Sequence, residues 1–281
     1  MKVLELINIG EKKLKNKNIY TSRLDSEILL SKILNKEREE ILINLDKKIC
    51  EKHHLKYKNL IQRRSLHEPV AYILEEKEFW SKKFQVSPDT LIPRPETELL
   101  VDKLIKIFKK KRISILDMGT GSGCILISLL SELKKSKGTG IDISKKALII
   151  AKKNAKKLGV FGQITFFNKS LDSNFSQKYD LIVSNPPYIE SSQIKNLAED
   201  VRQYEPRIAL DGGNDGLDLI KKVIYKTKHI LKDNGTLALE IGNGQFKKVS
   251  EILLKNNFKI EHIIKDYKSN IRCIISTKIN N

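Results

Sequence analysis

The sequence predicts an α/β fold in which a small N-terminal helical bundle precedes a doubly wound sheet of seven strands. Two observations predict the sheet. Short apolar runs alternate with helical patterns from about residue 113 onward, and a glycine-rich turn joins the first of these runs to a helix. Such alternation implies a mainly parallel sheet covered by helices on both faces. A third observation predicts the bundle, because residues 1–80 show helical periodicity without reliable strand alternation.

The bundle is expected to contain at least three helices. Leu4 and Ile7 indicate a first helix, which closes near Gly10 or continues to Asn18. A second opens around 21–25, and an amphipathic run covers 52–64. A strand-rich linker then extends to about residue 95, with strands expected near its two phenylalanine-containing stretches at 79–80 and 84–86.

The second domain is expected to span residues 96–281 and to open with a helix from Glu96 to about Lys109. The predicted strands are 113–118, 138–142, 164–168, 180–184, 235–241, 259–264 and 271–277. The predicted helices between them are 123–135, 145–158, 216–232 and 245–256. The last two strands should be antiparallel, because their connection is too short for a crossover helix.

The first predicted strand of this domain runs directly into a glycine loop. A strand, a glycine turn and a helix form the nucleotide-binding opening of doubly wound folds. The dinucleotide fingerprint places its third glycine where this chain has Cys124, so a bound pyrophosphate is not the best interpretation. A glycine turn can also serve only tight packing. The loop consists of Gly119, Thr120, Gly121, Ser122 and Gly123.

Asp142 ends the next strand, roughly 20 residues after the glycine loop, as expected for a carboxylate that binds ribose hydroxyls. The alternative is that Asp142 caps the helix that begins near Ser144, although Ser144 is itself a good N-cap residue.

The stretch Asn185-Pro186-Pro187-Tyr188 follows the apolar run 180–184 and cannot continue a central strand, since proline lacks a backbone donor. A stiff turn is therefore expected at the ligand-binding edge of the sheet. The Asn185 amide oxygen and the neighbouring carbonyls can accept both hydrogens of a planar NH2 group, and Tyr188 offers an aromatic face. An ordinary proline-rich turn is the alternative interpretation.

These motifs, in this order, resemble an S-adenosylmethionine-dependent methyltransferase that modifies a planar nitrogen. The stretches 87–98 and 205–213, with Glu240-Ile241-Gly242 and Asp266-Tyr267, narrow the resemblance to the peptide chain release factor glutamine N5-methyltransferases, the PrmC/HemK family. The resemblance covers nearly the whole chain. It implies a Rossmann-like seven-stranded methyltransferase sheet and a substrate-recognition role for the N-terminal domain.

The resemblance also implies an activity: methylation of the glutamine in the Gly-Gly-Gln loop of class I release factors, in support of translation termination. The implied catalytic residues are Asn185, Pro186 and Tyr188, with Pro187 as a further substrate contact. The implied S-adenosylmethionine contacts are Gly119, Thr120, Gly121, Ser122, Gly123, Asp142, Ser170 and Asn185.

The chain departs from this family at Lys169 and Ser170, where relatives commonly place an acidic and then a large apolar residue near the cofactor adenine. Lys169 cannot accept a hydrogen bond from the adenine amine, and Asp172 is the alternative acceptor. A second departure is Glu75, where the family usually has glycine.

Two expectations concern the wall of the site. Arg94, Glu96 and Thr97 are read either as a wall over the site or as a cap of the helix from residue 96. Glu205 and Arg207 are expected to order the segment 189–214 by a salt bridge.

Two alternative functions stay open. An adenine N6-methyltransferase would use the same Asn-Pro-Pro-Tyr chemistry on a flipped base, although no separate target-recognition domain is evident. A binding module would retain the fold without the activity.

The formal charge of +19 resembles that of a nucleic-acid-binding protein, but the excess is lysine spread along the whole chain. Direct nucleic-acid binding is therefore not expected. The three isolated cysteines predict neither a metal site nor disulfides and fit a cytoplasmic protein. The N-terminal residues lack the apolar core of a signal peptide.

Overall fold

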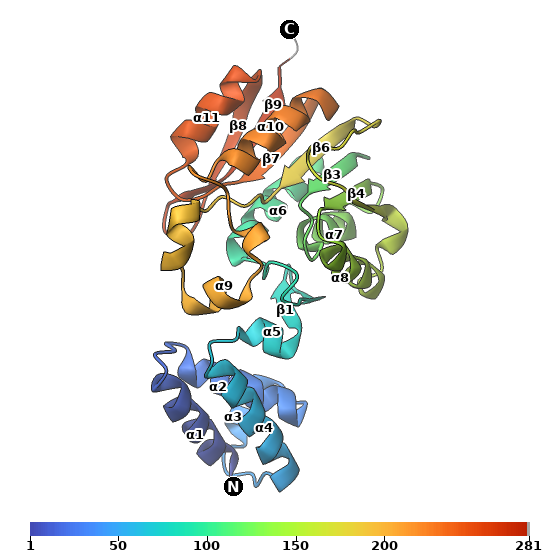
Figure 1. Ribbon diagram of the computed structural model, residues 1–281. Helices are drawn as coiled ribbons and strands as arrows, with labels where there is room; N and C mark the ends of the chain where they lie inside the picture. The colour runs from blue at the N-terminus through green and yellow to red at the C-terminus, as the bar shows by residue number, and fades with distance from the viewer. Residues whose placement is uncertain (280–281) are drawn as a thin grey trace. The chain divides into compact units, whose positions relative to one another are not determined.

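The computed structural model describes residues 1–279, which divide into two compact units (Figure 1). The first unit comprises Met1–Glu76 together with Ala198–Tyr204, and the second comprises Lys77–Leu197 and the chain from Glu205 onward. The first unit is therefore built from two separate segments of the chain, a feature that the sequence did not predict.

The long segment of the first unit folds into helices, as predicted. The first helix continues past Gly10 but ends at Lys15, between the two expected ends at Gly10 and Asn18. Its apolar positions meet those of the following helices in a buried core that includes Leu6, Leu30 and Ile61. A buried ion pair joins two of the helices, with 2.7 Å between Arg64 Nε and Asp25 Oδ2. The helices are α1 (Val3–Lys15), α2 (Ser22–Leu34), α3 (Arg38–Ile43), α4 (Glu51–Arg64) and α5 (Val70–Leu74).

The short segment of the first unit forms α9 (Glu199–Tyr204). The Tyr204 hydroxyl donates to the Leu66 carbonyl at 2.6 Å, and Glu199 lies 3.3 Å from His67 Nε2. These contacts attach α9 to the chain just after α4.

Glu75 ends α5 in the left-handed conformation, with φ of +55°. The family that the sequence resembles is expected to have glycine at this position, and the backbone gives a reason, since a Cβ is disfavoured there. We expect Glu75→Gly to raise the free energy of unfolding by about 0.5–1 kcal/mol, the gain in left-handed geometry being partly offset by glycine's chain entropy. Urea denaturation measures this change, and a lower stability of the variant would refute it.

The second unit begins with the predicted strand-rich linker, which forms a hairpin of β1 (Glu76–Phe79) and β2 (Lys82–Gln85). The rings of Phe79 and Phe84 pack edge to face at 6.0 Å, and both are fully buried in the main core. The helix α6 (Pro95–Phe108) follows, beginning within one residue of its predicted start.

The predicted α/β, Rossmann-like, seven-stranded sheet is confirmed. Its strand order is β5-β4-β3-β6-β7-β9-β8, and all neighbouring pairs are parallel except those that involve β9 (Figure 1). The final hairpin is antiparallel, as its short connection predicted. The strands are β3 (Ser114–Met118), β4 (Lys137–Asp142), β5 (Ile164–Asn168), β6 (Tyr179–Ser184), β7 (Leu231–Glu240), β8 (Phe258–Lys265) and β9 (Ile271–Lys278).

Alternate residues of the central strands enter two different apolar cores. In β3, Ile115 belongs to the core with α6 and α7, whereas Leu116 belongs to the core with α10 and α11. This alternation explains why the central strands are continuously apolar, since both faces of the sheet are covered. The covering helices are α6, α7 (Cys124–Glu132), α8 (Lys145–Lys157), α10 (Asp218–Ile230) and α11 (Phe246–Lys255).

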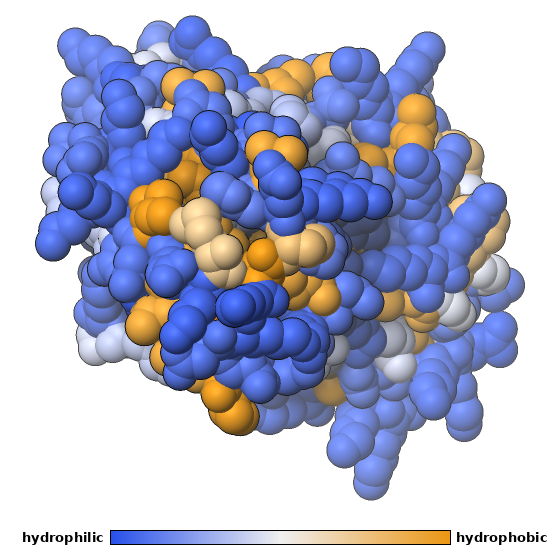
Figure 2. All heavy atoms as spheres, turned by 90° about the horizontal axis from the view of Figure 1, so that it is seen from below, coloured by the Kyte–Doolittle hydropathy of each residue, from blue (hydrophilic) through white to orange (hydrophobic). Residues whose placement is uncertain are grey.

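The remaining connections contain short 3₁₀ helices. The segment 189–214, which has no long apolar period, contains η2 (Ser191–Asn196) and η3 (Arg207–Ala209) on either side of α9, and η1 (Phe161–Gln163) precedes β5. Figure 2 shows hydrophilic side chains over most of the face in view, with smaller apolar patches between them. Within residues 1–279, no helix is long and apolar enough to cross a membrane.

The sheet brings three predicted motifs to one edge. Met118 at the end of β3 pairs with Ile141 of β4 and with Ser184 of β6. The chain order reverses between β3 and β6, which makes this edge the topological switch point where open α/β sheets bind ligands.

Candidate active site

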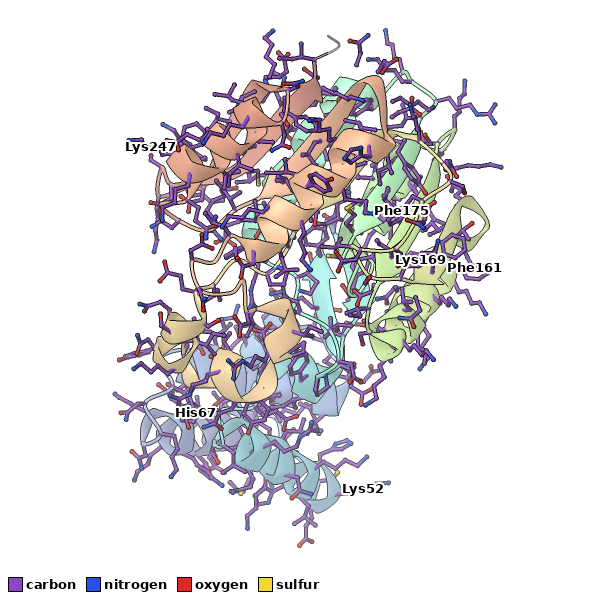
Figure 3. The ribbon with its side chains drawn as sticks, turned by 45° about the horizontal axis from the view of Figure 1, so that its top comes forward. Lys52, His67, Phe161, Lys169, Phe175 and Lys247 are labelled. Atoms are coloured by element: carbon purple, nitrogen blue, oxygen red, sulfur yellow. The ribbon has the colours of Figure 1, made fainter. Side chains whose placement is uncertain are left out.

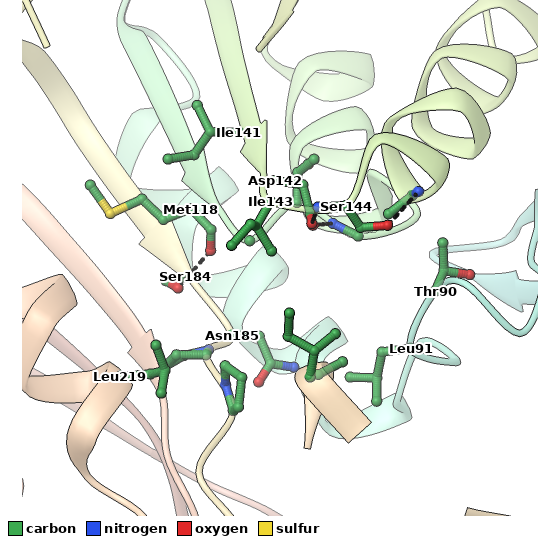
Figure 4. Close-up of a pocket in the computed structure, with 18 of the residues that line it drawn as sticks. Thr90, Leu91, Met118, Ile141, Asp142, Ile143, Ser144, Ser184, Asn185 and Leu219 are labelled. Atoms are coloured by element: carbon green, nitrogen blue, oxygen red, sulfur yellow. Dashed lines mark hydrogen bonds between the residues drawn. The ribbon is translucent and has the colours of Figure 1, made fainter. Parts of the chain in front are cut away.

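A cavity of about 460 Å³ opens at this edge (Figure 4). Its lining comes from the carboxyl ends of β3, β4 and β6, from the segment before α6, and from η3 and α10. The volume is within the range of pockets that hold a cofactor-sized ligand. All lining residues belong to the second unit.

The glycine loop forms one wall. Gly119 and Gly121 have positive φ, and a Cβ built on either would have no atom within 4 Å. The backbone there is thus open to a ligand, and Thr120 and Ser122 also line the cavity. Gly123 does not line it: a Cβ there would lie 2.7 Å from the Ile127 side chain. Gly123 therefore serves tight packing at the start of α7.

Asp142 is the last residue of β4, directly before the turn that leads to α8. Its carboxylate accepts hydrogen bonds from the backbone amides of Gly121 at 2.9 Å and Ser144 at 2.8 Å. The N-cap of α8 is Ser144, whose hydroxyl accepts from Ala147 N at 3.2 Å. Asp142 thus holds the glycine loop in place, and Ser144, rather than Asp142, caps α8. Burial raises the pKa of Asp142 above its usual value.

Asn168 supports the same turn from β5. Its side-chain amide donates to the carbonyls of Asp142 at 2.9 Å and Ile143 at 2.8 Å. The carboxylate and the loop around it are therefore held by separate groups.

Asp117 lies beneath the glycine loop and is 1% exposed. One carboxylate oxygen accepts from the Thr120 hydroxyl at 2.7 Å, and the other is buried without a hydrogen-bond partner among residues 1–279. Burial raises the pKa of Asp117 to about 7. A cation in the adjoining cavity would favour the ionised form of this carboxyl.

The turn after β6 forms the opposite wall. The Ser184 hydroxyl donates to the Met118 carbonyl at 2.7 Å, which ties the end of β6 to that of β3. Asn185, Pro186 and Pro187 line the cavity. Tyr188 does not line it, and its hydroxyl lies 3.4 Å from Glu240 Oε1. The packing of Tyr188 against a planar amide therefore stays a prediction.

The end of the cavity predicted to receive adenine contains Lys169, Ser170 and Asp172. Lys169 Nζ donates to the Asn174 carbonyl at 3.2 Å and lies 5.4 Å from the ring centre of Phe175 (Figure 3). The charged amine of Lys169 thus interacts with residues of its own loop. The carboxylate of Asp172 lies 3.1 Å from Lys222 Nζ of α10.

The segment before α6 supplies a third wall, which includes Arg94 and Thr97. The predicted salt bridge between Glu205 and Arg207 is wrong. Buried Glu205 instead pairs with Arg94 at 2.5 Å and accepts from the Ile92 amide at 3.1 Å. Arg207 pairs with Asp211. Thr97 is not a cap either, because its hydroxyl donates to Glu240 at 2.6 Å.

Replacing Glu205 with alanine would leave the Ile92 amide and the Arg94 guanidinium without this acceptor. We expect the free energy of unfolding to fall by about 1–3 kcal/mol, the cost of leaving a buried polar group unsatisfied. Thermal or urea denaturation measures it. Arg207→Ala, which breaks the exposed pair with Asp211, is the control and should cost under about 1 kcal/mol; equal losses in both variants would contradict the assignment.

Sequence reasoning missed three residues that contact Tyr188. They are Glu240 at the end of β7, Arg272 in β9 and Gln245 before α11. The stretch 240–242 contributes to the family resemblance, but the sequence does not indicate that its glutamate contacts Tyr188. No local pattern indicates that these side chains meet, because they converge from elements remote in sequence.

Known proteins share the fold of this chain. The methyltransferase small domain model matches residues 95–204. The hMettl16 catalytic domain, solved in complex with a MAT2A 3′UTR hairpin, aligns with a TM-score of 0.59 and 14% identity, covering 82% of this chain and 83% of that one. A methyltransferase from Pyrococcus furiosus aligns with a TM-score of 0.53 and 17% identity, covering 69% and 88%. These likenesses show that the second unit has a methyltransferase fold.

The sequence relatives are more specific. The release factor glutamine methyltransferase of Fusobacterium nucleatum is 40% identical over 98% of this chain and 78% of its own length. That of Buchnera aphidicola subsp. Acyrthosiphon pisum is 41% identical over 93% of this chain and 94% of its own length. The PrmC N-terminal domain model matches residues 5–74. The chain belongs to the release factor glutamine methyltransferase family. It spans 58% of the length of the bifunctional methyltransferase of Rickettsia typhi, to which it is 37% identical.

The cofactor of this family is S-adenosylmethionine, and the cavity residues fit it. We expect the open backbone at Gly119 and Gly121 to admit the methionine part, and the Asp142 carboxylate to accept from ribose hydroxyls. Asp117, buried beneath the glycine loop, would supply negative charge near a ligand that carries a sulfonium and an ammonium group.

The Asp117 carboxyl predicts how cofactor affinity depends on pH. Its pKa is about 7 without a ligand, and a bound cation lowers it, so binding releases protons near neutral pH. We expect affinity to rise between about pH 6 and pH 8 and then level off. Calorimetry in buffers of different ionisation enthalpy counts the protons. Asp117→Asn should bind with little pH dependence, and an unchanged proton release in that variant would assign the effect to another group.

Proposed function

We propose that this protein transfers the methyl group of S-adenosylmethionine to the side-chain amide nitrogen, N5, of the glutamine in the Gly-Gly-Gln loop of class I release factors, and so supports translation termination. The observation that carries this proposal is that the Asn185-Pro186-Pro187 turn, the glycine loop and Asp142 line one cavity. The names of the Fusobacterium and Buchnera relatives support the choice of acceptor.

The chain's own residues have two tasks in this reaction, alignment and exclusion of water. An amide nitrogen is a poor nucleophile because its lone pair is delocalised into the carbonyl. The Asn185 side-chain oxygen and the Pro186 carbonyl accept the two N–H hydrogens, which aims the nitrogen and favours the positive charge that develops on it. S-adenosylmethionine, when bound, supplies an electrophilic sulfonium methyl. The N–C bond forms as the S–C bond breaks, and the methylated nitrogen then loses a proton to water.

The cavity walls are suited to this chemistry. Ile125, Ile143 and Leu219 contribute apolar surface to the walls, and polar groups of the glycine loop and Asn185 line the same cavity. An apolar cavity excludes water and strengthens the hydrogen bonds that orient the amide.

Residues 1–80, with the linker to about residue 95, are proposed as the substrate-recognition domain, and 96–281 as the methyltransferase domain. The protein acts in the cytoplasm, on a protein substrate and without direct nucleic-acid binding. Removing the N-terminal domain should abolish modification of the intact release factor. Full activity of the truncated chain on that substrate would refute the recognition role.

The decisive test offers radiolabelled S-adenosylmethionine to the protein together with a purified class I release factor, its loop Gln→Ala variant, and unmethylated DNA. Label on the intact factor and not on its variant supports the proposal. Label on DNA alone would establish an adenine methyltransferase instead. Cofactor binding without transfer to any acceptor would favour a binding module.

A further inference from the structure

The Tyr188 hydroxyl, which the proposed mechanism does not use, is held by a polar network behind the cavity. Arg272 Nη2 donates to it at 3.0 Å, and it donates to Glu240 Oε1 at 3.4 Å. The Arg272 guanidinium also lies over the Tyr188 ring, 5.6 Å from its centre. The other oxygen of Glu240 accepts from the Thr97 hydroxyl. The network therefore joins the turn after β6 to β7, β9 and α6.

The backbone of Tyr188 is also held in place by neighbouring residues. Gln245 Nε2 donates to the Tyr188 carbonyl at 2.9 Å. Three glycines lie so close to Tyr188 that a Cβ on any of them would crowd it. A Cβ at Gly216 would lie 2.5 Å from the Tyr188 carbonyl oxygen, one at Gly212 would lie 2.8 Å from its Cα, and one at Gly242 would lie 3.1 Å from its ring. Tyr188 thus occupies a close-fitting socket, formed by Gly212, Gly216, Gly242, Gln245, Glu240 and Arg272.

The charges in the socket require an explanation. Glu240 has no exposed surface, and burial raises its pKa above the usual value. A buried carboxylate is costly unless it is paired and hydrogen-bonded, and an apolar pair in its place is often no less stable. Arg272, Thr97 and the Tyr188 hydroxyl supply the compensating interactions. The arrangement fixes one orientation of the Tyr188 side chain. It does so at the cost of burying charged groups, which apolar packing would avoid.

We propose that Glu240 and Arg272 are positioning residues that hold the Tyr188 hydroxyl and thereby fix the geometry of the turn from Asn185 to Tyr188. This inference rests on the proposed function. Asn185 and Pro186 align the acceptor nitrogen only if the backbone at the far end of the turn does not rotate, and a misplacement of about 1 Å at a reacting group costs on the order of 10²-fold in rate.

The test uses the full-length protein with Tyr188→Phe, Arg272→Met, Glu240→Gln and the double variant of the first two. Each single change should lower kcat about 10–100-fold, with KM for the release factor and calorimetric affinity for the cofactor within about 2-fold of wild type, as expected for lost alignment. The double variant should be no slower than the slower single variant, because both remove one interaction. Arg272→Lys should restore part of the rate.

A matched control lies at the opposite end of β6. There Asp180 accepts from Lys232 Nζ at 2.8 Å and from the Ser114 amide at 2.8 Å. Asp180→Asn and Lys232→Met should lower stability without changing kcat. An unchanged kcat in Tyr188→Phe, additive losses in the double variant, or equal losses of kcat in the control pair would overturn the proposal.

A second readout does not depend on activity. In protein labelled with ¹³Cζ-tyrosine, the Tyr188 resonance is identified by its absence from Tyr188→Phe. Arg272→Met and Glu240→Gln should both shift it, and the control pair should not. If wild-type protein modified no release factor, the proposed function would fail, yet this spectrum would still report the network; an unshifted resonance would refute the positioning role itself.

Discussion

Replacing Asn185 with alanine is expected to lower the rate of methyl transfer roughly 10²–10³-fold, the usual effect of removing one group that stabilises developing charge. The alanine variant retains the proline turn and the cavity but loses the side-chain acceptor for one N–H of the substrate amide. Cofactor affinity should change little, because the glycine loop and Asp142 are untouched. Single-turnover kinetics with a release factor and calorimetry with the cofactor measure the two effects.

Two further variants separate chemistry from geometry at this position. Asn185→Gln keeps the amide but moves it by one methylene, so it should lose nearly as much activity as the alanine variant. Asn196→Ala removes an exposed asparagine that bonds to Gln193, and it should have wild-type kinetics. Turnover of Asn185→Ala at the wild-type rate would exclude the proposed alignment.

Replacing Asp142 with alanine is expected to weaken cofactor binding about 10–100-fold, since hydrogen bonds to a charged group contribute roughly 1.5–3 kcal/mol. The carboxylate would no longer accept from ribose hydroxyls, and the Gly121 amide would lose its partner. Calorimetric titration with the cofactor measures this loss directly.

Asn168→Ala is the matched control for Asp142. It removes the two hydrogen bonds that hold the same loop but leaves the carboxylate in place. A loss of affinity as large as that of Asp142→Ala would show that loop order, rather than the carboxylate, determines binding.

The sequence predicted those features that depend on neighbouring residues. The apolar runs, the glycine turn and the proline turn located every strand of the seven-stranded sheet and its ligand-binding edge, because strand and turn signals are local. The sequence predicts two possible ends for α1, at Gly10 and Asn18, and the helix ends between them at Lys15; its buried Leu14 explains why it continues past Gly10.

Long-range polar contacts escaped prediction. Glu205 was paired with Arg207, two residues away, whereas its partner Arg94 lies 111 residues earlier in the chain. The partners of Tyr188, at positions 240 and 272, are likewise remote. Polar pairing has no periodicity that a single sequence reveals, so only the fold shows which charges meet.

The helix α9 has a consequence for synthesis on the ribosome. The first unit is interrupted by 121 residues of the second, and it is complete only when Tyr204 has been made. The helices α1–α5 are translated early. The groups that bind α9, such as the Leu66 carbonyl, cannot form these contacts until α9 has also been translated. By then β3, β4, β5 and β6 have also been translated. The first unit is therefore completed only after a large part of the second has been translated, rather than before it, as in the N-to-C order usual for domains of a growing chain.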